Sequence, residues 1–254
     1  MQRAGFFVVI LETDRPLAIR RHVALSEALY EDTWTVEDIT ARKAGSPADF
    51  PAIWAEGAVP VLADPKADLL KAVRPAVVVD AIIAKKNLGT VRDMARCGVV
   101  AMGPGFTAGE DADIVIETNR GHNLGRLLFT GAAAPDTGIP GDIKGYAEER
   151  VIHAPASGVL HVLTPIGAET KKGDPIALIG DTPVLATMDG IVRGMLKDGM
   201  EVPEGLKMAD IDPRREEQQN CFTISDKSRN LGGAVLEAVL ILLARCNESP
   251  HAHL

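Results

Sequence analysis

The sequence predicts an α/β protein in which a mostly parallel sheet is followed by a smaller all-β domain and a C-terminal helix. In the first half, short aliphatic runs alternate with helical segments, as in a parallel sheet covered by helices. In the second half, glycines recur roughly every eight to ten residues without helical periodicity, which favours short strands joined by turns. The last apolar stretch has the length of a helix.

Five short apolar runs are the expected strands of the parallel sheet. They are residues 6–11, 59–63, 76–79, 99–102 and 114–116. The first run has no polar alternation, so we expect it to be buried on both faces.

Two helices are expected between these strands. Ser46-Pro47-Ala48-Asp49 predicts a helix start, because a Ser cap precedes Pro at the first helical position and an acid follows three residues on. This helix should turn Phe50, Ile53 and Trp54 inward and end at Gly57. A second, shorter helix is expected near residues 67–73.

The second half contains an internal repeat with a constant offset of 32 residues. Ala154, Gly158, Gly167, Glu169, Gly173, Ala177 and Ile179 recur as Ala186, Gly190, Gly199, Glu201, Gly205, Ala209 and Ile211. Two such copies should pack as a flattened, pseudo-twofold barrel of antiparallel strands.

Residues 214–220 are expected to form an exposed loop, and residues 221–224 a strand or buried turn. An apolar helix over residues 231–245, entered through Gly232-Gly233, should be followed by a frayed tail. The predicted domains are therefore 1–149, 150–212 and 213–254, with the last returning to pack on the α/β domain.

Composition limits the classes of function. Of the 254 residues, 46% are hydrophobic and 24% charged, as in soluble globular proteins. The formal net charge of −8 argues against a nucleic-acid partner, which requires a basic stripe. The most apolar stretch, residues 234–244, is interrupted by Glu237 and is short for a bilayer span, and the N-terminus does not resemble a signal peptide. We expect a cytoplasmic protein without membrane attachment.

The three cysteines are Cys97, Cys221 and Cys246, and none forms a CxxC pair. We therefore expect neither a metal site nor a redox dithiol, and an odd number at wide spacing fits a reduced chain. Cys221 precedes an apolar run, so a buried core thiol is its default role.

A glycine-rich turn follows the strand at 99–102. Gly103, Gly105 and Gly109 could let backbone N–H groups approach an anion at the end of a strand. A tight turn that needs positive φ explains them equally well, because the spacing matches neither a dinucleotide fingerprint nor a P-loop.

A polar cluster follows the strand at 114–116. Arg120 suits a phosphate or carboxylate, and His122 could titrate near neutral pH, although a surface turn is the alternative. Because both turns follow strand ends, we expect one binding site, made of Gly103, Gly105, Gly109, Glu117, Asn119, Arg120 and His122. Glu12 ends the first strand, where a dinucleotide fold keeps an acid for ribose hydroxyls.

The repeat resembles the biotinyl/lipoyl-type barrel-sandwich hybrid. In carrier versions of that fold, a Lys sits at the joint between the two halves. Here the joint, residues 180–185, contains no Lys, and Lys171 and Lys172 lie in a different turn. The resemblance therefore implies a packing or docking module that carries no biotin or lipoate.

Six segments together resemble YqeB-type accessory proteins of the selenium-dependent molybdenum hydroxylase system. They are residues 16–21, 84–90, 103–109, 116–122, 136–138 and 221–227. Members of that family usually begin with a strand and a glycine-rich turn upstream of what is here Arg3-Ala4-Gly5. A Rossmann-like sheet that is incomplete at its N-terminus is therefore expected.

The resemblance implies a role in maturation and supplies no reaction, so it stays open whether the chain is an enzyme. One hypothesis is a factor that binds a molybdopterin-type cofactor or a nucleotide during selenation or insertion, with the hydroxylase and selenium-handling proteins as partners. The candidate catalytic residues are Cys221, which would handle sulfur or selenium in this role, and His122, which would act as acid or base in a nucleotide-dependent enzyme with Glu12 on the ribose. The alternatives are a nucleotide-dependent oxidoreductase or transferase, and a docking scaffold without chemistry.

Overall fold

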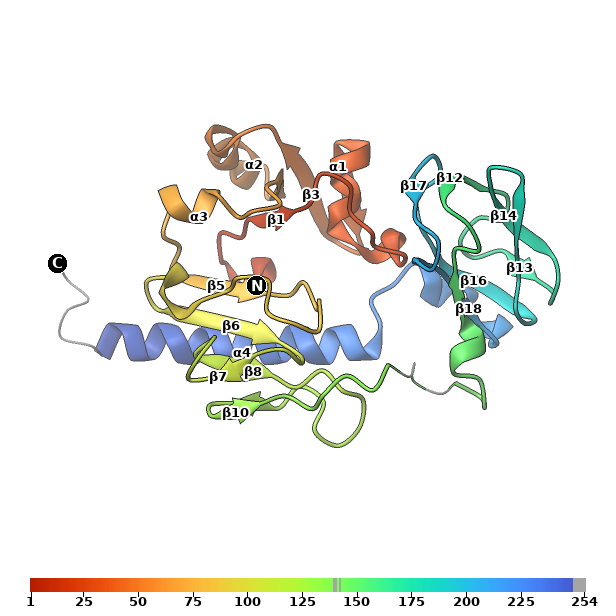
Figure 1. The fold of residues 1–254 in the computed structure, drawn as a ribbon. Coiled ribbons are helices and arrows are strands. Elements are labelled where there is room, and N and C mark those ends of the chain that lie inside the picture. Colours follow the sequence, from red (N-terminus) through yellow and green to blue (C-terminus); the bar gives the residue numbers. More distant parts are fainter. Residues whose placement is uncertain (139–140, 142, 249–254) are drawn as a thin grey trace. The chain divides into compact units, whose positions relative to one another are not determined.

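The computed structural model describes residues 1–138, 141 and 143–248 as a mixed α/β fold with several sheets and a long C-terminal helix (Figure 1). The chain divides into two compact units. The first contains Met1–Phe6, Lys66–Gly138 and the segment from Ser225 onward, and the second contains Phe7–Pro65 and Ile139–Ile224. This division cuts across the predicted range 1–149. The expected frayed tail lies mostly outside the described residues.

The first unit contains a four-stranded sheet in the order β5-β6-β8-β9. β5 (Val77–Asp80), β6 (Gly98–Met102) and β8 (Ile114–Ile116) run parallel, and β9 (Leu127–Leu128) is antiparallel. Smaller elements of this unit are η1 (Gln2–Ala4), α3 (Leu69–Ala72), η5 (Arg92–Met94), β7 (Thr107–Ala108) and β10 (Gly131–Ala132).

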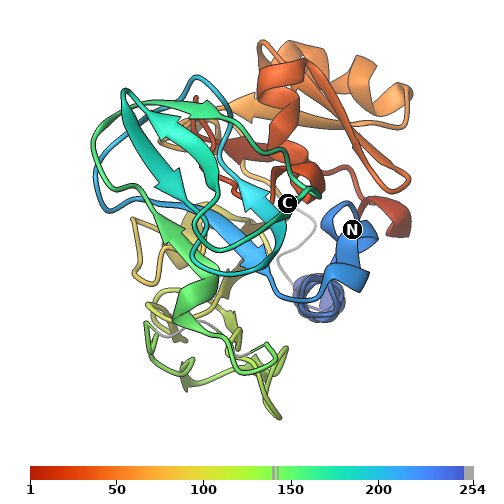
Figure 2. The ribbon, with the colours of Figure 1, turned by 90° about the vertical axis from the view of Figure 1, so that its right-hand side faces the viewer.

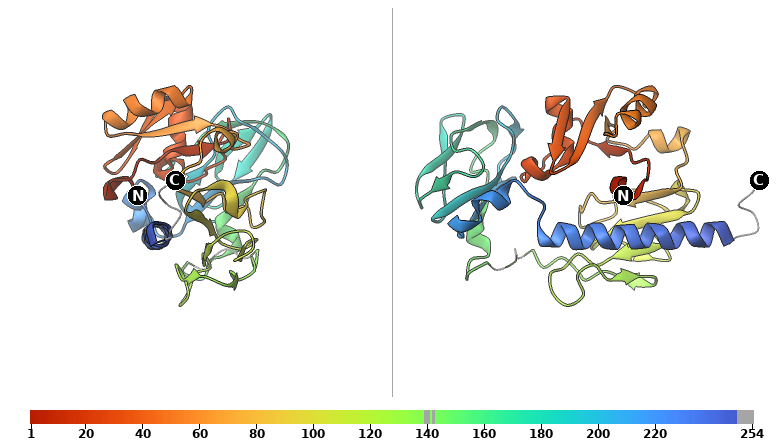
Figure 3. Two further views of the ribbon diagram at one scale, coloured as in Figure 1. Left: turned by 90° about the vertical axis from the view of Figure 1, so that its left-hand side faces the viewer. Right: turned by 180° about the vertical axis from the view of Figure 1, so that it is seen from behind.

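One face of this sheet is covered by α4 (Asp226–Glu248), which Figure 3 shows running along the strands. Its buried residues Leu231, Ala234, Val235, Ala238, Val239 and Leu242 pack with Val100, Ile114 and Ile116. The helix begins five residues before the predicted start at 231, and Gly232 and Gly233 lie inside it. Ser225 accounts for the earlier start, because its hydroxyl accepts the Ser228 N–H at 3.3 Å, as a helix cap does.

By length and composition alone, the stretch Arg215–Asn247 could cross a membrane, because it contains an 18-residue window with a mean hydropathy of 1.3. This is weak evidence, because the core helix of a soluble protein passes the same test, and α4 buries its apolar stripe against the sheet. The absence of a membrane partner therefore stays a prediction.

The first unit also contains a disulfide between Cys97 and Cys246, with the two Cα atoms 5.2 Å apart. The expectation that all cysteines are reduced was therefore wrong for this pair. Wide spacing in the sequence says nothing about spatial distance, and α4 brings its last turns back to the start of β6. Leu242 packs there against Gly98, where an added Cβ would lie 3.0 Å from a Leu242 methyl.

The second unit contains a sheet in the order β1-β4-β3-β2. Its strands are β1 (Ile10–Glu12), β2 (Thr33–Val36), β3 (Ile39–Ala44) and β4 (Val59–Ala63), with β1, β3 and β4 parallel. The strands expected in one parallel sheet thus lie in two different sheets. The expected strand at 6–11 is reduced to β1, and Phe7 is exposed, so that prediction was wrong.

The predicted helix start at Ser46 is confirmed. The Ser46 hydroxyl accepts the Ala48 N–H, and the Asp49 carboxylate accepts the Ser46 N–H at 2.9 Å. η4 (Pro47–Asp49) leads into α2 (Phe50–Ala55), which buries Phe50 and Ile53 as expected. The remaining short elements here are η2 (Arg21–Val23), η3 (Leu25–Glu27) and α1 (Ala28–Glu31).

Residues 151–212 form two four-stranded antiparallel sheets, in the orders β11-β18-β16-β13 and β15-β14-β12-β17 (Figure 2). After η6 (Glu148–Arg150), the strands are β11 (Val151–His153), β12 (Gly158–Val162), β13 (Glu169–Thr170), β14 (Pro175–Ile179), β15 (Thr182–Leu185), β16 (Gly190–Met195), β17 (Glu201–Val202) and β18 (Lys207–Asp212). One buried cluster that includes Leu160, Ile176, Ile191, Met208 and Ile211 fills the space within this module.

Strand pairing confirms the 32-residue repeat. β12 pairs with β14 at Leu160↔Ile179, and β16 pairs with β18 at Val192↔Ile211. β12 also pairs with β17 at Gly158↔Val202, and β16 pairs with β13 at Gly190↔Thr170. These four pairs correspond at the 32-residue offset, so Gly158 and Gly190 are equivalent. The halves differ at the register shift between Val192 and Gly194, which β12 lacks.

The two outer faces of this module differ. Over the β16 sheet lie the chain at Ile19 and the helix η7 (Arg215–Cys221), in a stretch that had been predicted as a loop. The Ile19 carbonyl accepts the Met195 N–H at 2.8 Å. The equivalent face of the β12 sheet leaves Val159, Leu163 and Leu185 exposed.

The module should carry no biotin or lipoate. The joint between β14 and β15 is the two-residue turn Gly180-Asp181, closed by the pair Ile179↔Thr182, and offers no amine for attachment. Intact mass spectrometry of protein purified from its own host should give the mass of the unmodified chain. A biotinyl or lipoyl adduct on any lysine would contradict this prediction.

Candidate functional site

The candidate site lies at the carboxyl edge of the parallel strands β5, β6 and β8. The register places Asp80 beside Ala101 and Met102 beside Ile116, so the segments after these strands start together. The Gly103 N–H donates to the Ile116 carbonyl at 2.9 Å. The prediction that the glycine-rich turn and the polar cluster lie side by side at one sheet edge is therefore confirmed.

Close packing explains Gly103 and Gly105, two of the three glycines of the turn. At Gly103 (φ 83°), an added Cβ would lie 2.7 Å from the Thr118 hydroxyl, and at Gly105 (φ 99°), 2.4 Å from the Lys86 Cα. Gly109 (φ 91°) closes a tight turn in which its N–H donates to the Ala112 carbonyl at 2.8 Å. These three glycines do not line the pocket beside them, which favours the alternative of a turn that needs positive φ.

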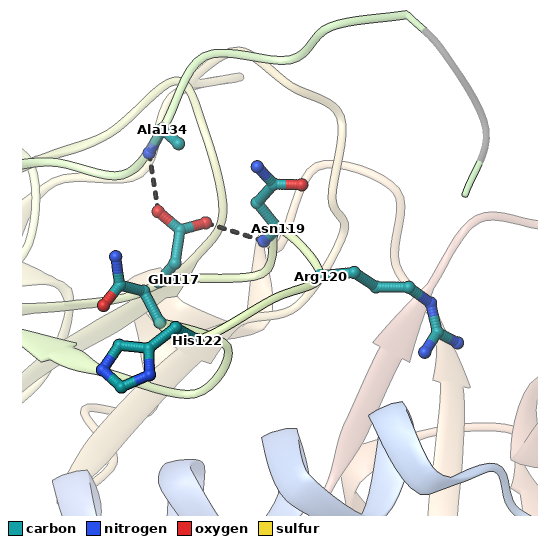
Figure 4. Close-up of a pocket in the computed structure, with 6 residues that line it drawn as sticks. Glu117, Asn119, Arg120, His122 and Ala134 are labelled. Carbon is teal, nitrogen blue, oxygen red and sulfur yellow. Dashed lines mark hydrogen bonds between the residues drawn. The ribbon is translucent and has the colours of Figure 1, made fainter. Parts of the chain in front are cut away.

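The polar cluster forms a small pocket of about 100 Å³. It is lined by Glu117, Asn119, Arg120, His122, Asn123 and Ala134 (Figure 4). The structure thus gathers the four predicted polar residues, from Glu117 to His122. Asn123 and Ala134 were not predicted. Ala134 lies in the pocket because the chain comes back to it after β10, which no local sequence signal shows.

Glu117 organises this pocket. Glu117 is only 6% exposed, and its carboxylate accepts the N–H groups of Asn119 and Ala134, each at 2.7 Å. The bond from Asn119 tightens the turn after β8, and the bond from Ala134 attaches the segment that leads to Asp136. A buried carboxylate held in this way fixes the pocket wall.

Arg120 points away from the Glu117 carboxylate, as Figure 4 shows. Its guanidinium reaches Asp226, in the first turn of α4, at 3.4 Å, and both side chains are exposed. A surface ion pair of this length contributes little to stability, so Arg120 remains available to a ligand with a stronger negative charge.

Lys227 is a second cation near this pocket. Burial lowers its pKa, and the neighbouring positive charge of Arg120 lowers it further, while Glu117 acts in the opposite direction. The segment 221–227 contains Lys227, but the terminal helix was predicted to begin only at residue 231, so Lys227 was not placed at the start of a helix. The signal that could have identified it is the cap Ser225 three residues before Ser228.

The segment 84–90 also lies at this edge. Its Thr90 hydroxyl donates to the buried carboxylate of Asp80 at 2.6 Å, and Lys85 pairs with Asp136 at 2.8 Å. Gly105 approaches the backbone of Lys86. Direct contacts or electrostatic interactions therefore join five stretches of the chain at this edge. They are residues 84–90, 103–109, 116–122, 136–138 and the helix start at 226–227.

Glu12 and Cys221 belong to the second unit, whereas the pocket belongs to the first. Glu12 ends β1, and its carboxylate accepts the Thr13 N–H at 2.8 Å. Cys221 is 1% exposed within the core of the antiparallel module, and burial raises the pKa of its thiol. A buried neutral thiol is a poor nucleophile, so the structure favours the default core role for Cys221.

Within the part of the chain that the structure describes, no group of three or more His, Cys, Asp or Glu side chains is arranged to hold a metal ion. Carboxylates at the candidate edge are instead engaged with backbone amides, hydroxyls and cations. The chemistry that this edge offers is recognition of anions and hydrogen-bonding groups.

Comparison with known proteins gives one extensive match in sequence, and no family model matches. The chain is 47% identical over 243 residues to the Escherichia coli (strain K12) protein named "Uncharacterized protein YqeB". The alignment covers 96% of this chain and 44% of that relative, so the chain spans less than half of the relative's length. The similarity supports a YqeB-type protein, and the relative's name specifies no activity.

Solved structures give only distant matches. A succinylglutamate desuccinylase/aspartoacylase from Rhodobacter sphaeroides is 25% identical over 25% of this chain and 22% of its own, with a TM-score of 0.23. The product-bound ectoine utilization protein EutE (DoeB) from Ruegeria pomeroyi is 15% identical over 80% of this chain and 84% of its own, with a TM-score of 0.27.

Proposed function

We propose that the carboxyl edge of β5, β6 and β8 binds an anionic, phosphate-bearing cofactor. The observation that carries this proposal is the gathering of cations from separate segments at one edge of an acidic chain. Lys85 and Lys86 follow β5, Arg120 follows β8, and Lys227 begins α4. With a formal net charge of −8, the chain would otherwise repel an anion.

The cations are held loosely enough to change partners. Arg120 contacts Asp226 across 3.4 Å, and both groups face solvent, as do Lys85 and Asp136. An exposed pair of this kind contributes little to stability, because solvent screens it. A phosphate with two negative charges, bound bidentately by the Arg120 guanidinium, offers a stronger contact. The Asn119 amide and His122 in the adjacent pocket could then hydrogen-bond the remainder of the ligand.

We further propose that this ligand is a molybdopterin-type cofactor or a nucleotide, handled during maturation of selenium-dependent molybdenum hydroxylases. The resemblance of the six segments to YqeB-type accessory proteins supports this role, and four of those segments meet at the candidate edge together with Asp226 and Lys227 of a fifth. Molybdenum hydroxylase and selenium-handling proteins would be the partners, in the cytoplasm.

We also propose a finer description of the fold, a Rossmann-like sheet and a barrel-sandwich hybrid. Parallel pairing of β5, β6 and β8 supports a Rossmann-like sheet for the first unit. The symmetric pairing over residues 151–212 supports a barrel-sandwich hybrid. In that fold the module would serve for packing or docking, because its joint lacks Lys.

Arg120→Ala should weaken the binding of a phosphorylated pterin or of AMP roughly ten- to a hundredfold, because a charge-assisted hydrogen bond of about 1.5–3 kcal/mol is lost. The melting temperature should barely change, because the Arg120–Asp226 pair is exposed. Isothermal titration calorimetry on wild type and variant measures the affinity, and differential scanning calorimetry measures the melting temperature.

The matched control is Lys71→Ala, which removes another exposed cation, paired with Asp68, from the same unit. It should leave affinity unchanged. If Arg120→Ala instead unfolds the protein without loss of affinity per folded molecule, Arg120 is a structural ion-pair residue. The assignment of the pocket then fails.

Two other functions lead to different results in the same titration. A nucleotide-dependent oxidoreductase or transferase should bind AMP or a dinucleotide in preference to a pterin, and His122→Gln should remove turnover while retaining affinity. A docking scaffold should bind neither ligand in either variant. The cations gathered at the sheet edge favour the first proposal over the scaffold.

A further inference from the structure

Glu117 is a buried carboxylate without a cationic partner. Four acidic residues are buried in the part of the chain that the structure describes, and they are Glu27, Asp80, Glu117 and Asp212. Glu27 and Asp212 each pair with at least one arginine. Glu117 forms no ion pair with a described residue, and its carboxylate accepts only two backbone N–H groups. A buried negative charge that lacks a cation depends on hydrogen bonds for its stabilisation.

The carboxylate of Glu117 can accept further hydrogen bonds. Its Oε1 accepts the Asn119 N–H and its Oε2 accepts the Ala134 N–H, one bond to each oxygen (Figure 4). A carboxylate offers about four lone-pair positions, so each oxygen can accept one more donor. Glu117 also lines the pocket, which Asp80 does not. A ligand in the pocket is therefore matched best when it brings two neighbouring N–H donors.

The other residues of the pocket limit which part of a ligand can lie against Glu117. Arg120 lines the same pocket, and its guanidinium points away from the Glu117 carboxylate (Figure 4). A ligand that places its phosphate on Arg120 must present an uncharged part to Glu117, because two negative charges repel each other. Asn119, His122 and Asn123 add side chains that donate or accept hydrogen bonds. The pocket therefore suits the polar edge of a neutral heterocycle.

Heterocycles differ in the edge that they offer to a carboxylate. Guanine and pterins carry a ring N–H group beside an exocyclic amino group, which gives two donors in one plane. Two parallel N–H···O bonds to one carboxylate are the arrangement that an arginine side chain also uses. Adenine carries its amino group beside a ring nitrogen that accepts, so one carboxylate oxygen would face a lone pair. Hypoxanthine has the ring N–H group and lacks the amino group.

We propose that Glu117 selects ligands whose ring carries an N–H group next to an amino group, as in guanine and pterins, and discriminates against adenine. This inference rests on the proposed binding of a phosphate-bearing cofactor and narrows its chemical class. A site that accepts two hydrogen bonds rejects an analogue without the donors, because its buried acceptor is then left unpaired. Glu117 thus sets the specificity of the pocket, whereas Arg120 contributes affinity for any phosphate-bearing ligand.

Isothermal titration calorimetry with GMP, IMP and AMP tests this inference on the wild-type chain. The three ligands share ribose 5′-phosphate, so the contact with Arg120 stays constant and only the edge of the ring changes. We expect GMP to bind roughly ten- to a hundredfold more tightly than AMP, with IMP between them. The backbone amide NMR signals of Asn119 and Ala134, which donate to Glu117, should shift more with GMP than with AMP.

Glu117→Gln should reduce the affinity for GMP to near that for AMP, because the N–H₂ group of the amide opposes the donors of the ring. The matched control is Glu237→Gln, which removes an exposed carboxylate from α4 and should leave the preference for GMP intact.

AMP binding as tight as GMP binding in the wild type would overturn the inference and leave the phosphate site in place. A preference for GMP that survives in folded Glu117→Gln would overturn it as well. If this variant does not fold, equal shifts of the Asn119 and Ala134 signals with GMP and AMP would do the same. If none of the three ligands binds, both the inference and the binding of a nucleotide phosphate at Arg120 are wrong.

Discussion

Asp212→Asn should lower the free energy of unfolding by about 3–5 kcal/mol, the usual result of removing one partner from a buried ion pair. Asp212 is fully buried and accepts hydrogen bonds from Arg214, at 2.9 Å to Nε and 2.7 Å to Nη2, and from Arg193. An amide in its place would leave two guanidinium groups without their negative partner and would direct an N–H₂ group toward them. Urea denaturation at pH 7 measures the loss.

The same carboxylate predicts a pH dependence. Burial opposes ionisation of Asp212, but hydrogen bonds from Arg214 and the charge of Arg193 outweigh it and lower the pKa from 3.8 to about 2. Because the pKa is lower in the folded state, this stabilisation is complete above pH 3.8 and is lost as pH falls through about 2. The difference in stability between wild type and Asp212→Asn should therefore narrow only below pH 3.8.

Asp68→Asn is the matched control for both measurements. Asp68, directly before α3, pairs with Lys71 at the surface, and surface pairs of this kind contribute little to stability. A loss for Asp212→Asn no greater than that of Asp68→Asn would mean that the buried cluster contributes nothing to stability.

Reduction of the Cys97–Cys246 disulfide should lower the stability of the first unit by up to about 5 kcal/mol. The bond closes a loop with a sequence separation of 149 residues, and long loops restrict the unfolded chain most strongly. The midpoint of urea denaturation should therefore fall when a phosphine reductant is added to the wild type. Thiol titration of the unreduced, denatured protein should find a single free thiol, that of Cys221.

The double variant Cys97→Ser/Cys246→Ser provides the control. It should unfold at the midpoint of the reduced wild type, and the reductant should have no effect on it. A shift that the reductant still causes in this variant would have to come from another source. The stabilising role of the disulfide would then be wrong.

Local signals predicted several elements well. The capping pattern from Ser46 to Asp49 and the apolar runs at 59–63 and 114–116 each depend on neighbouring residues, and all three were confirmed. The repeat was also visible, because glycines required at equivalent turns recur at one offset. The side-by-side position of the two turns followed from the rule that parallel strands end at one edge.

Other features depended on distant contacts. Nothing in residues 6–11 shows that only its end enters a sheet, or that the parallel strands separate into two sheets. The hairpin of β2 and β3 has no long apolar run, and its turn places the non-glycine Glu37 at a φ of 56°. Lys227 joins the candidate site only because α4 begins at Asp226 and packs beside the polar cluster.

The strand pairing of the antiparallel module has a consequence for how it can fold. β12 pairs with β17 and β14 with β15, while β16 pairs with β13 and β18 with β11, so each half supplies both edge strands to the sheet of the other half. A single half, cut at Gly180-Asp181, would leave its central strand without an edge partner. The isolated half would regain edge strands most simply by exchanging strands with an identical half, which gives a domain-swapped dimer. The smallest cooperative element of this module is therefore both copies of the repeat together, although the sequence repeats after 32 residues.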